Sequence, residues 1–255
     1  MEITLRTYLI CCPLIFLGGF VDAIAGGGGL ITLPAYLLAG LPAHFAYGTN
    51  KFGSACGTTI AVVQYQRGGR IRWDYAPVAV LAAFIGSWCG AKLVLYLSER
   101  TLGAVMMVIL PVVAVFLLTN KSLGAEGVEK VLTPGQRYLR LAAIGFAVGA
   151  YDGFFGPGAG TFYTLGFTLM LGLPLVEASG TSKVLNLVSN LAALGAYVMG
   201  GKVLYALAIP CAVCSMLGNF LGVKMAVRIG APLIRKMMTV VLALLLLKVA
   251  GNLFT

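Results

Sequence analysis

The sequence predicts an all-α polytopic membrane protein made of two inverted-topology repeats. Three observations lead to this fold class. Hydrophobic residues make up 60% of the 255-residue chain and charged residues only 10%, whereas charged residues form about a quarter of an ordinary soluble domain. The apolar runs are continuous, which is typical of membrane-spanning helices. One sequence unit also occurs twice.

The repeat is marked by short motifs at a nearly constant spacing. The quartet "GTNK" at 48–51 recurs as "GTSK" at 180–183, 132 positions later, and "GLP" at 40–42 recurs at 172–174. Asp22 recurs as Asp152, 130 positions later. A spacing held through several landmarks indicates duplication. We therefore divide the single transmembrane domain into a first repeat at 1–119, a cytoplasmic linker at 120–136 and a second repeat at 137–255.

Each repeat contains five apolar segments in the same order. They lie at 8–25, 30–40, 50–66, 73–97 and 101–119, and at 137–155, 161–171, 182–199, 203–227 and 232–254. A full crossing needs about 20 residues, so 30–40 and 161–171 are too short to span alone. Each is either a re-entrant half-helix or the first part of a helix kinked at its "GLP". A broken or re-entrant helix pair plus three transmembrane helices per repeat gives about eight to ten membrane segments in total.

The net charge of +10 orients the chain. Basic residues gather in short loops, which the positive-inside rule places in the cytoplasm. If the loop 67–72 is cytoplasmic, its counterpart 200–202 lies outside and the basic loop 228–236 lies inside. The repeats are therefore predicted to be inverted, as in secondary transporters. No basic face is interleaved with aromatic residues, so we expect no nucleic-acid partner.

The apolar N-terminus has no small-x-small cleavage site and runs directly into the first repeat. We expect it to be a first membrane segment rather than a signal peptide. The predicted location is the lipid bilayer, which the chain crosses several times.

Glycine-rich stretches interrupt the same apolar segment of each repeat. Glycine costs about 1 kcal/mol and proline about 3 kcal/mol inside a helix, relative to alanine. Broken backbone is tolerated at membrane depth only where protein or a water-filled cavity covers it. We predict helix breaks at Gly26, Gly27, Gly28 and Gly29 and at Gly156, Pro157, Gly158 and Gly160.

The two quartets are candidate anion sites. Thr49 and Thr181 are predicted N-caps of the segments 50–66 and 182–199. Free N–H groups, hydroxyls and a lysine at a helix start favour an anion. The alternative is that each lysine only snorkels to the membrane interface, but its repetition favours a functional role. The predicted substrate-binding residues are Thr49, Asn50, Lys51, Thr181, Ser182, Lys183 and, one turn further on, Asn186. Whether both lysines reach one site stays open.

Asp22 and Asp152 lie four residues before the breaks. An intramembrane carboxylate is costly and is a functional candidate by default. Either residue has a coupling role, by accepting a proton, or a structural role, by capping broken backbone or neutralising a lysine. His44 and Glu177 have no counterpart in the other repeat, and we expect them to form local hydrogen bonds.

The sequence has no nucleophile–base set and no nucleotide-binding motif, so we expect neither an enzyme nor a cofactor. The "CAVC" at 211–214 lacks a second cysteine pair or a histidine nearby, so we expect no metal site. The G-x-x-x-G spacings at 86–90 and 218–222 predict close helix packing.

These motifs together resemble the sulfite exporter TauE/SafE family, also called the 4-toluene sulfonate uptake permease family. The resemblance is carried by the aspartate–glycine stretches, the two quartets, the G-G-[RK]-[IV] loops and the paired G-x-x-x-G-x-K, and it covers nearly the whole chain. It implies a multi-pass permease of the cell inner (plasma) membrane for sulfite, sulfonates or related organic anions. Many members of the family have no known substrate.

The resulting hypothesis is a secondary transporter for small anions that works by alternating access and is coupled to protons. The alternatives are an anion channel and a membrane sensor or assembly protein without a substrate. The sequence does not decide the oligomeric state and is compatible with a homo-oligomer.

Overall fold

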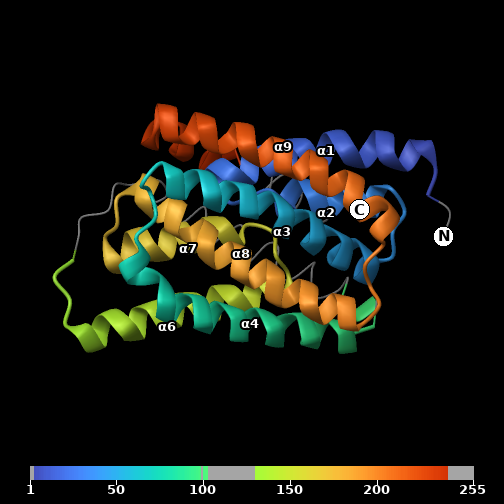
Figure 1. Cartoon of the computed structure of the whole chain (residues 1–255). Coiled ribbons are helices and arrows are strands. Elements are labelled where there is room, and N and C mark those ends of the chain that lie inside the picture. Colours follow the sequence, from blue (N-terminus) through green and yellow to red (C-terminus); the bar gives the residue numbers. More distant parts are fainter. Residues whose placement is uncertain (1–2, 99, 103–129, 241–255) are drawn as a thin grey trace.

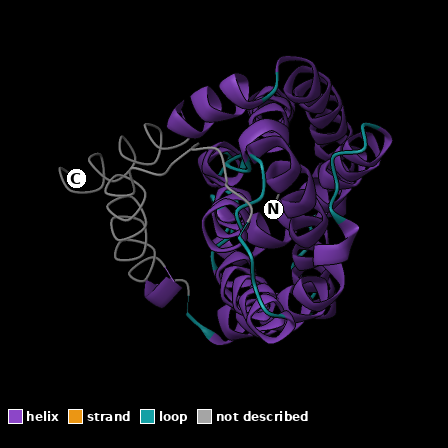
Figure 2. Cartoon of the chain, turned by 90° about the vertical axis from the view of Figure 1, so that its left-hand side faces the viewer, coloured by secondary structure: helices purple, strands orange, loops and turns teal. Residues whose placement is uncertain are grey.

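The computed structural model describes residues 3–98, 100–102 and 130–240, which contain helices and no strand (Figures 1 and 2). The helices are α1 (Leu5–Ala25), α2 (Gly29–Leu38), α3 (Ala43–Arg67), η1 (Trp73–Tyr75), α4 (Ala76–Tyr96), α6 (Pro134–Phe154), α7 (Ala159–Gly166), the π-helical η2 (Phe167–Leu171), α8 (Leu175–Met199) and α9 (Tyr205–Ile229). Residues 231–240 are also helical. Most of the predicted segments 101–119 and 232–254 and of the linker 120–136 lies outside the described residues.

Three of the described helical segments are long and apolar enough to cross a membrane: α1, Trp73–Tyr96 and α9. All three expose large apolar side chains, and Leu9, Leu81 and Ile209 are 67%, 63% and 56% exposed. Soluble proteins rarely expose extended apolar surface, whereas lipid-facing helices require it. The prediction of a helical membrane protein is therefore confirmed.

The helices of one repeat pack mainly on those of the other. The long, buried helices α3 and α8 cross the middle of the molecule, between a pair formed by α1 and α9 and a pair formed by α4 and α6 (Figure 1). α3 packs on α9 and α8 on α4, and α3 and α8 also contact each other. Each of the two hydrophobic clusters of the core therefore contains residues of both repeats.

Glycines allow the outer pairs to approach closely. A Cβ added at Gly86 in α4 would lie 2.4 Å from the carbonyl oxygen of Phe146 in α6. A Cβ at Gly218 in α9 would lie 2.1 Å from the carbonyl oxygen of Phe16 in α1. Any side chain at these positions would push the helices apart, so the predicted role of the two G-x-x-x-G motifs in packing is confirmed.

The start of the third helical segment of each repeat differs from the prediction. α3 begins at Ala43 and α8 at Leu175, after the N-cap residues Pro42 and Pro174, so both quartets lie inside helices. The predicted N-cap roles of Thr49 and Thr181 are therefore wrong. Proline disfavours helix in the residue before it and has no N–H to leave unpaired, so each "GLP" sets the helix start.

The glycine of each quartet permits close packing rather than breaking a helix. A Cβ at Gly48 would lie 2.1 Å from the carbonyl oxygen of Lys202, and one at Gly180 would lie 2.2 Å from that of Arg70. The loop of one repeat therefore rests directly on the quartet of the other.

Both predicted helix breaks are present, and they meet. α1 ends at Ala25, followed by Gly26 with φ +80°, and α6 ends at Phe154, before Gly156 and Gly158 with φ +91° and +84°. The breaks are narrower than predicted, because Gly29 and Gly160 already belong to α2 and α7. A Cβ at Gly26 would lie 2.2 Å from the carbonyl carbon of Gly160, so one broken segment packs directly on the other.

The helices that follow the breaks are short. The ten residues of α2 span about 15 Å, against a hydrocarbon thickness of about 30 Å. α2 and α3 are separate helices with Gly40 at φ +85° between them. α2 and α7 are thus too short to cross a membrane alone.

Candidate functional site

Two Lys–Asp ion pairs lie beside the broken segments, and each joins one repeat to the other. Lys51 Nζ lies 2.8 Å from Asp152 Oδ1, and Lys183 Nζ lies 3.0 Å from Asp22 Oδ2. The pairs are reciprocal, since the lysine of each quartet binds the aspartate of the other repeat. A buried charge without a partner costs several kcal/mol, so the lysines and aspartates of the two repeats depend on each other.

The Asp152 pair is enclosed in a hydrogen-bond network. Its lysine and carboxylate side chains are 2% and 4% exposed. Ser189 Oγ donates to Asp152 Oδ2, and Lys51 Nζ also donates to Asn190 Oδ1 at 3.0 Å. Asn190 Nδ2 in turn donates to Asn186 Oδ1 at 2.6 Å. Both carboxylate oxygens of Asp152 are therefore occupied by donors from the protein.

The Asp22 pair is less enclosed, because the side chain of Asp22 is 18% exposed while that of Lys183 is 1% exposed. Lys183 Nζ also donates to the backbone carbonyl of Asp22. The other carboxylate oxygen, Oδ1, accepts a long bond of 3.3 Å from the backbone N–H of Gly28. Asp22 thus makes both structural contacts considered from the sequence, to broken backbone and to a lysine.

A central cavity of about 20 Å³ borders the Asp152–Lys51 pair and the carboxylate side of the Asp22–Lys183 pair, and it is large enough for about one water molecule. It is lined by Asp22, Gly26, Gly29, Asn50, Lys51, Ser54, Asp152, Gly156, Asn186 and Asn190. The structure therefore brings together residues from both breaks, both aspartates and three of the predicted anion-binding residues.

The other predicted anion-binding residues do not line this cavity. The hydroxyl of Thr49 accepts a hydrogen bond from the N–H of Leu204 at 3.2 Å, and that of Thr181 accepts from the N–H of Arg72 at 3.0 Å. Ser182 Oγ donates to the carbonyl of Ser179 at 2.7 Å. The threonines hold the loop of the opposite repeat, which explains why they recur.

The predicted helix-start contribution to anion binding is wrong. Lys51 and Lys183 lie about two turns inside α3 and α8, where backbone N–H groups are engaged by the helix. Any attraction for an anion must therefore come from the lysine side chains and nearby polar groups.

The second break is covered by an aromatic cluster of Tyr151, Phe155 and Phe162. The ring of Tyr151 lies 5.7 Å from that of Phe155 and 5.1 Å, edge-on, from that of Phe162, measured between centroids. The hydroxyl of Tyr151 donates to the carbonyl of Pro157 at 2.6 Å. This bond ties the loop of the second break to α6.

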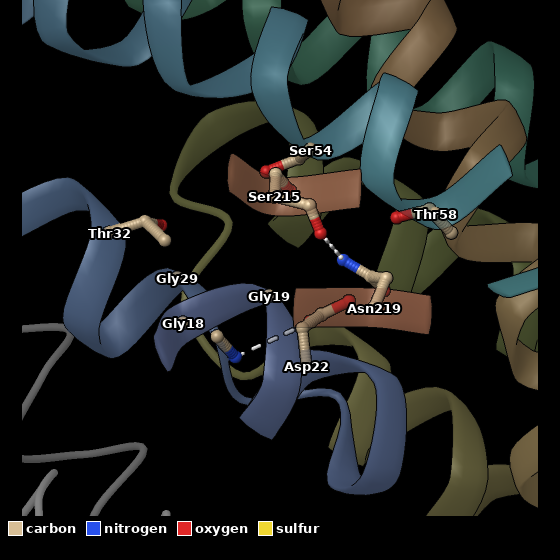
Figure 3. A pocket seen from close by; sticks show the side chains of 10 residues that line it. Gly18, Gly19, Asp22, Gly29, Thr32, Ser54, Thr58, Ser215 and Asn219 are labelled. Carbon is tan, nitrogen blue, oxygen red and sulfur yellow. Dashed lines mark hydrogen bonds between the residues drawn. The ribbon is translucent and has the colours of Figure 1, made fainter. Parts of the chain in front are cut away.

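A side cavity lies next to the first break, among α1, α2, α3 and α9 (Figure 3). Its volume is also about 20 Å³. It is lined by Gly18, Gly19, Asp22, Gly28, Gly29, Thr32, Ser54, Thr58, Ser215 and Asn219, and it shares Asp22, Gly29 and Ser54 with the central cavity. Asp22 therefore reaches both cavities.

Sequence reasoning missed several of these polar residues. Ser54 lies one turn beyond Asn50 on α3, and Ser189 precedes Asn190 on α8. Placing the helix starts at the "GLP" motifs would have shown that the polar face continues through each quartet. Ser215 and Asn219 were missed because one turn of polar residues on an apolar helix is a weak signal.

His44 and Glu177 form hydrogen bonds as predicted, but their partners lie far from them in the sequence. His44 Nε2 lies 3.1 Å from the carbonyl oxygen of Val94, and Glu177 Oε2 accepts from Arg72 at 3.4 Å. Hydrogen bonds from Arg72 to Asp74 raise the pKa of the guanidinium above its ordinary value, so Arg72 stays charged. Within the described residues, no group of three histidine, cysteine or acidic side chains is placed to hold a metal ion.

Comparison with known proteins identifies one family and relatives that are named as probable membrane transporters. The sequence model of the family described as "Sulfite exporter TauE/SafE" matches residues 11–249. The "Probable membrane transporter protein YfcA" of Escherichia coli K12 is 34% identical over 229 residues, covering 90% of this chain and 84% of that protein. The "Probable membrane transporter protein ORF9" of Sinorhizobium sp is 34% identical over 227 residues, covering 89% and 85%. A "Probable membrane transporter protein" of Haemophilus influenzae is 33% identical over 239 residues, covering 93% and 91%. No solved structure matches the chain.

Proposed function

The chain belongs to the sulfite exporter TauE/SafE family, and on that premise we propose that it carries small anions, of the sulfite or sulfonate class, across the cell inner membrane by alternating access. The observation that carries this proposal is a polar cavity lined by Lys51, Asp152 and Asp22 where two broken helices meet, with a second buried lysine, Lys183, bound to Asp22. Intramembrane charges of this kind mark ion and substrate pathways.

We propose that the repeats are inverted, with α2 and α7 as re-entrant half-helices. The reciprocal contacts support this arrangement, because Thr49 holds the loop at 204 while Thr181 holds the loop at 72. Equivalent residues exchange equivalent contacts across the interface, as a two-fold axis between the repeats requires. Transporters with inverted repeats place substrate where discontinuous helices meet.

The anion competes with the aspartates for the lysines. In the structure both lysines are paired with carboxylates, so a substrate oxyanion gains a lysine only when an aspartate lets it go. Neutralising the carboxylate, most simply with a proton, releases the lysine. This links the movement of an anion to that of a cation without any covalent step, so no enzyme chemistry is needed.

The small volume of the central cavity supports a carrier over a channel. About 20 Å³ between buried side chains is not a continuous water-filled path, whereas conduction needs one. The flux of a carrier saturates with substrate, and single-channel currents would favour the alternative.

The test is uptake of labelled sulfite into proteoliposomes containing the full chain. Replacing the charge in Lys51→Gln and in Lys183→Gln should each lower flux by roughly tenfold or more, because each removes a charge-assisted contact to the anion worth about 1.5–3 kcal/mol. Lys224→Gln is the control, since Lys224 is exposed on α9, and it should keep its flux. Undiminished flux in both quartet variants would remove the lysines from the mechanism.

A further inference from the structure

The side cavity has the chemistry of a site for a small cation. Apart from the Asp22 carboxylate, its lining offers neutral oxygen atoms from the side chains of Thr32, Ser54, Thr58, Ser215 and Asn219. Together with Asp22, these residues come from four helices, α1, α2, α3 and α9, that meet around the cavity (Figure 3). Hard cations prefer oxygen ligands of this kind.

Two of these oxygens are buried and lack a partner. Thr32 and Asn219 are 6% and 2% exposed, and within the described part of the chain Thr32 Oγ1 and Asn219 Oδ1 have no hydrogen-bond partner. The amide nitrogen of Asn219 donates to the carbonyl of Ser215 at 2.9 Å, which leaves the amide oxygen as a pure acceptor. A buried acceptor without a partner costs about 1–3 kcal/mol, and a cation would remove that cost.

The backbone around the cavity also favours a positive charge. Asp22 lies in the last turn of α1, which ends at Ala25, and the C-terminal end of a helix carries partial negative charge. Sodium and proton sites of secondary transporters are commonly built from such interrupted helices.

We propose that the side cavity binds Na⁺, with Asp22, Thr32 and Asn219 as its principal ligands. A cavity of about 20 Å³ has no room for a hydration shell, so the ion is held by protein oxygens. A monovalent ion is favoured because Lys183 already neutralises Asp22, and a divalent ion would leave two uncompensated charges.

Sodium at this position supplies the coupling that the proposed function requires, and this part of the inference rests on that function. Na⁺ on Asp22 weakens the hold of the carboxylate on Lys183, which then becomes available to the anion. With the cation alone the site carries one extra positive charge, and a bound monoanion cancels it. Each ion therefore raises the affinity for the other, and the coupling is reciprocal.

The first experiment measures binding without transport. The purified full chain in detergent is melted in NaCl, LiCl, KCl or choline chloride at constant ionic strength. We expect a saturable rise in Tm with Na⁺ that choline does not produce, since a ligand that binds the folded state stabilises it. Equal Tm values in NaCl and choline chloride would overturn the proposal and leave a site for water only. A rise with K⁺ but not with Na⁺ would also overturn it.

Two variants remove the unpartnered oxygens with little change in shape. In Thr32→Val and in Asn219→Leu, the Na⁺ concentration that gives half of the maximal rise in Tm should increase by roughly tenfold or more. This is the size of effect seen when a metal site loses a supporting group. The control is Thr168→Val, which removes a buried threonine hydroxyl that donates to the carbonyls of Thr164 and Leu165 in α7 and lies outside the side cavity. An unchanged Na⁺ response in both cavity variants would contradict the assignment even if their basal Tm falls.

The two proposals fail separately. If Na⁺ raises Tm while Lys51→Gln and Lys183→Gln transport normally, the cation site stands and the proposed anion pathway fails. If the lysine variants lose flux while Na⁺ leaves Tm unchanged, the pathway stands and the sodium site fails.

Discussion

The Asp22–Lys183 pair and the Asp152–Lys51 pair hold equivalent positions in the two repeats but have different surroundings. Asp152 accepts a hydrogen bond from Ser189 and its side chain is 4% exposed, whereas the side chain of Asp22 is 18% exposed and borders the side cavity. The sequence differs at the matching positions: Tyr151, Phe155 and Pro157 of the second repeat stand where the first has Val21, Ala25 and Gly27, and Ser189 stands where the first has Gly57.

The comparison shows that residues in the repeated motifs and residues outside them have different roles. The repeated motifs build the same scaffold twice, since both lysines, both aspartates and both quartet threonines make matching contacts. Residues outside the motifs enclose the Asp152–Lys51 pair more completely than the Asp22–Lys183 pair.

The largest predicted difference between the two ion pairs appears when the lysine of each pair is replaced by an uncharged residue. Lys51→Met leaves Asp152 buried without a cation, and we expect a loss of about 3–5 kcal/mol in the free energy of unfolding. Lys183→Met should cost clearly less, because Asp22 is 18% exposed and borders a cavity that can admit water. Denaturant unfolding of the purified protein in detergent micelles measures both losses.

The control for this prediction removes both charges of the enclosed pair. The double variant Lys51→Met/Asp152→Leu should recover most of the stability lost in Lys51→Met, because a buried ion pair is often replaced by apolar residues at little cost. Equal losses of unfolding free energy in Lys51→Met and Lys183→Met would show that the enclosure of the aspartate does not determine the cost of losing its lysine.

Substitution of the glycine in either quartet should lower stability by a similar amount, because both glycines pack against a loop of the other repeat. A Cβ would lie 2.1 Å from a loop carbonyl in Gly48→Ala and 2.2 Å in Gly180→Ala, so each loop must move. We expect a loss of about 1–3 kcal/mol in each variant, the usual cost of overpacking, and similar falls in sulfite flux. Thermal unfolding and proteoliposome uptake measure the two effects.

Gly135→Ala is the matched control for these substitutions. Gly135 lies in the first turn of α6 with no atom within 4 Å of an added Cβ, and alanine there should be neutral or slightly stabilising. A large difference between Gly48→Ala and Gly180→Ala would mean that the loops at 202 and 70 are not held equivalently.

Much of this frame could be predicted from the sequence. Hydropathy indicated the membrane class, and the two glycine-rich stretches indicated the paired breaks, because both signals depend on local composition. The G-x-x-x-G contacts also followed, since glycine at that spacing has few other uses in an apolar helix.

The rest depended on contacts between distant segments. Thr49 and Thr181 look like N-caps because threonine before a helical run usually is one, yet their partners are loop N–H groups more than a hundred positions away. The pairing of Lys51 with Asp152 likewise required the repeats to interlock. No local pattern encodes which aspartate meets which lysine, or that Ser215 and Asn219 would complete a cavity beside Asp22.

The smallest predicted effect concerns the second helix break alone. Tyr151→Phe keeps the ring contacts with Phe155 and Phe162 but removes the hydroxyl that donates to the Pro157 carbonyl. We expect a loss of about 0.5–1.5 kcal/mol, the net contribution of one hydrogen bond, and faster amide hydrogen exchange in residues 155–160 as the second break loosens. Residues 25–30 of the first break should keep their exchange rates, because the equivalent position is Val21 and has no hydroxyl to lose. Faster exchange at both breaks would mean that their packing at Gly26 and Gly160, rather than the aromatic cluster, holds the second break closed.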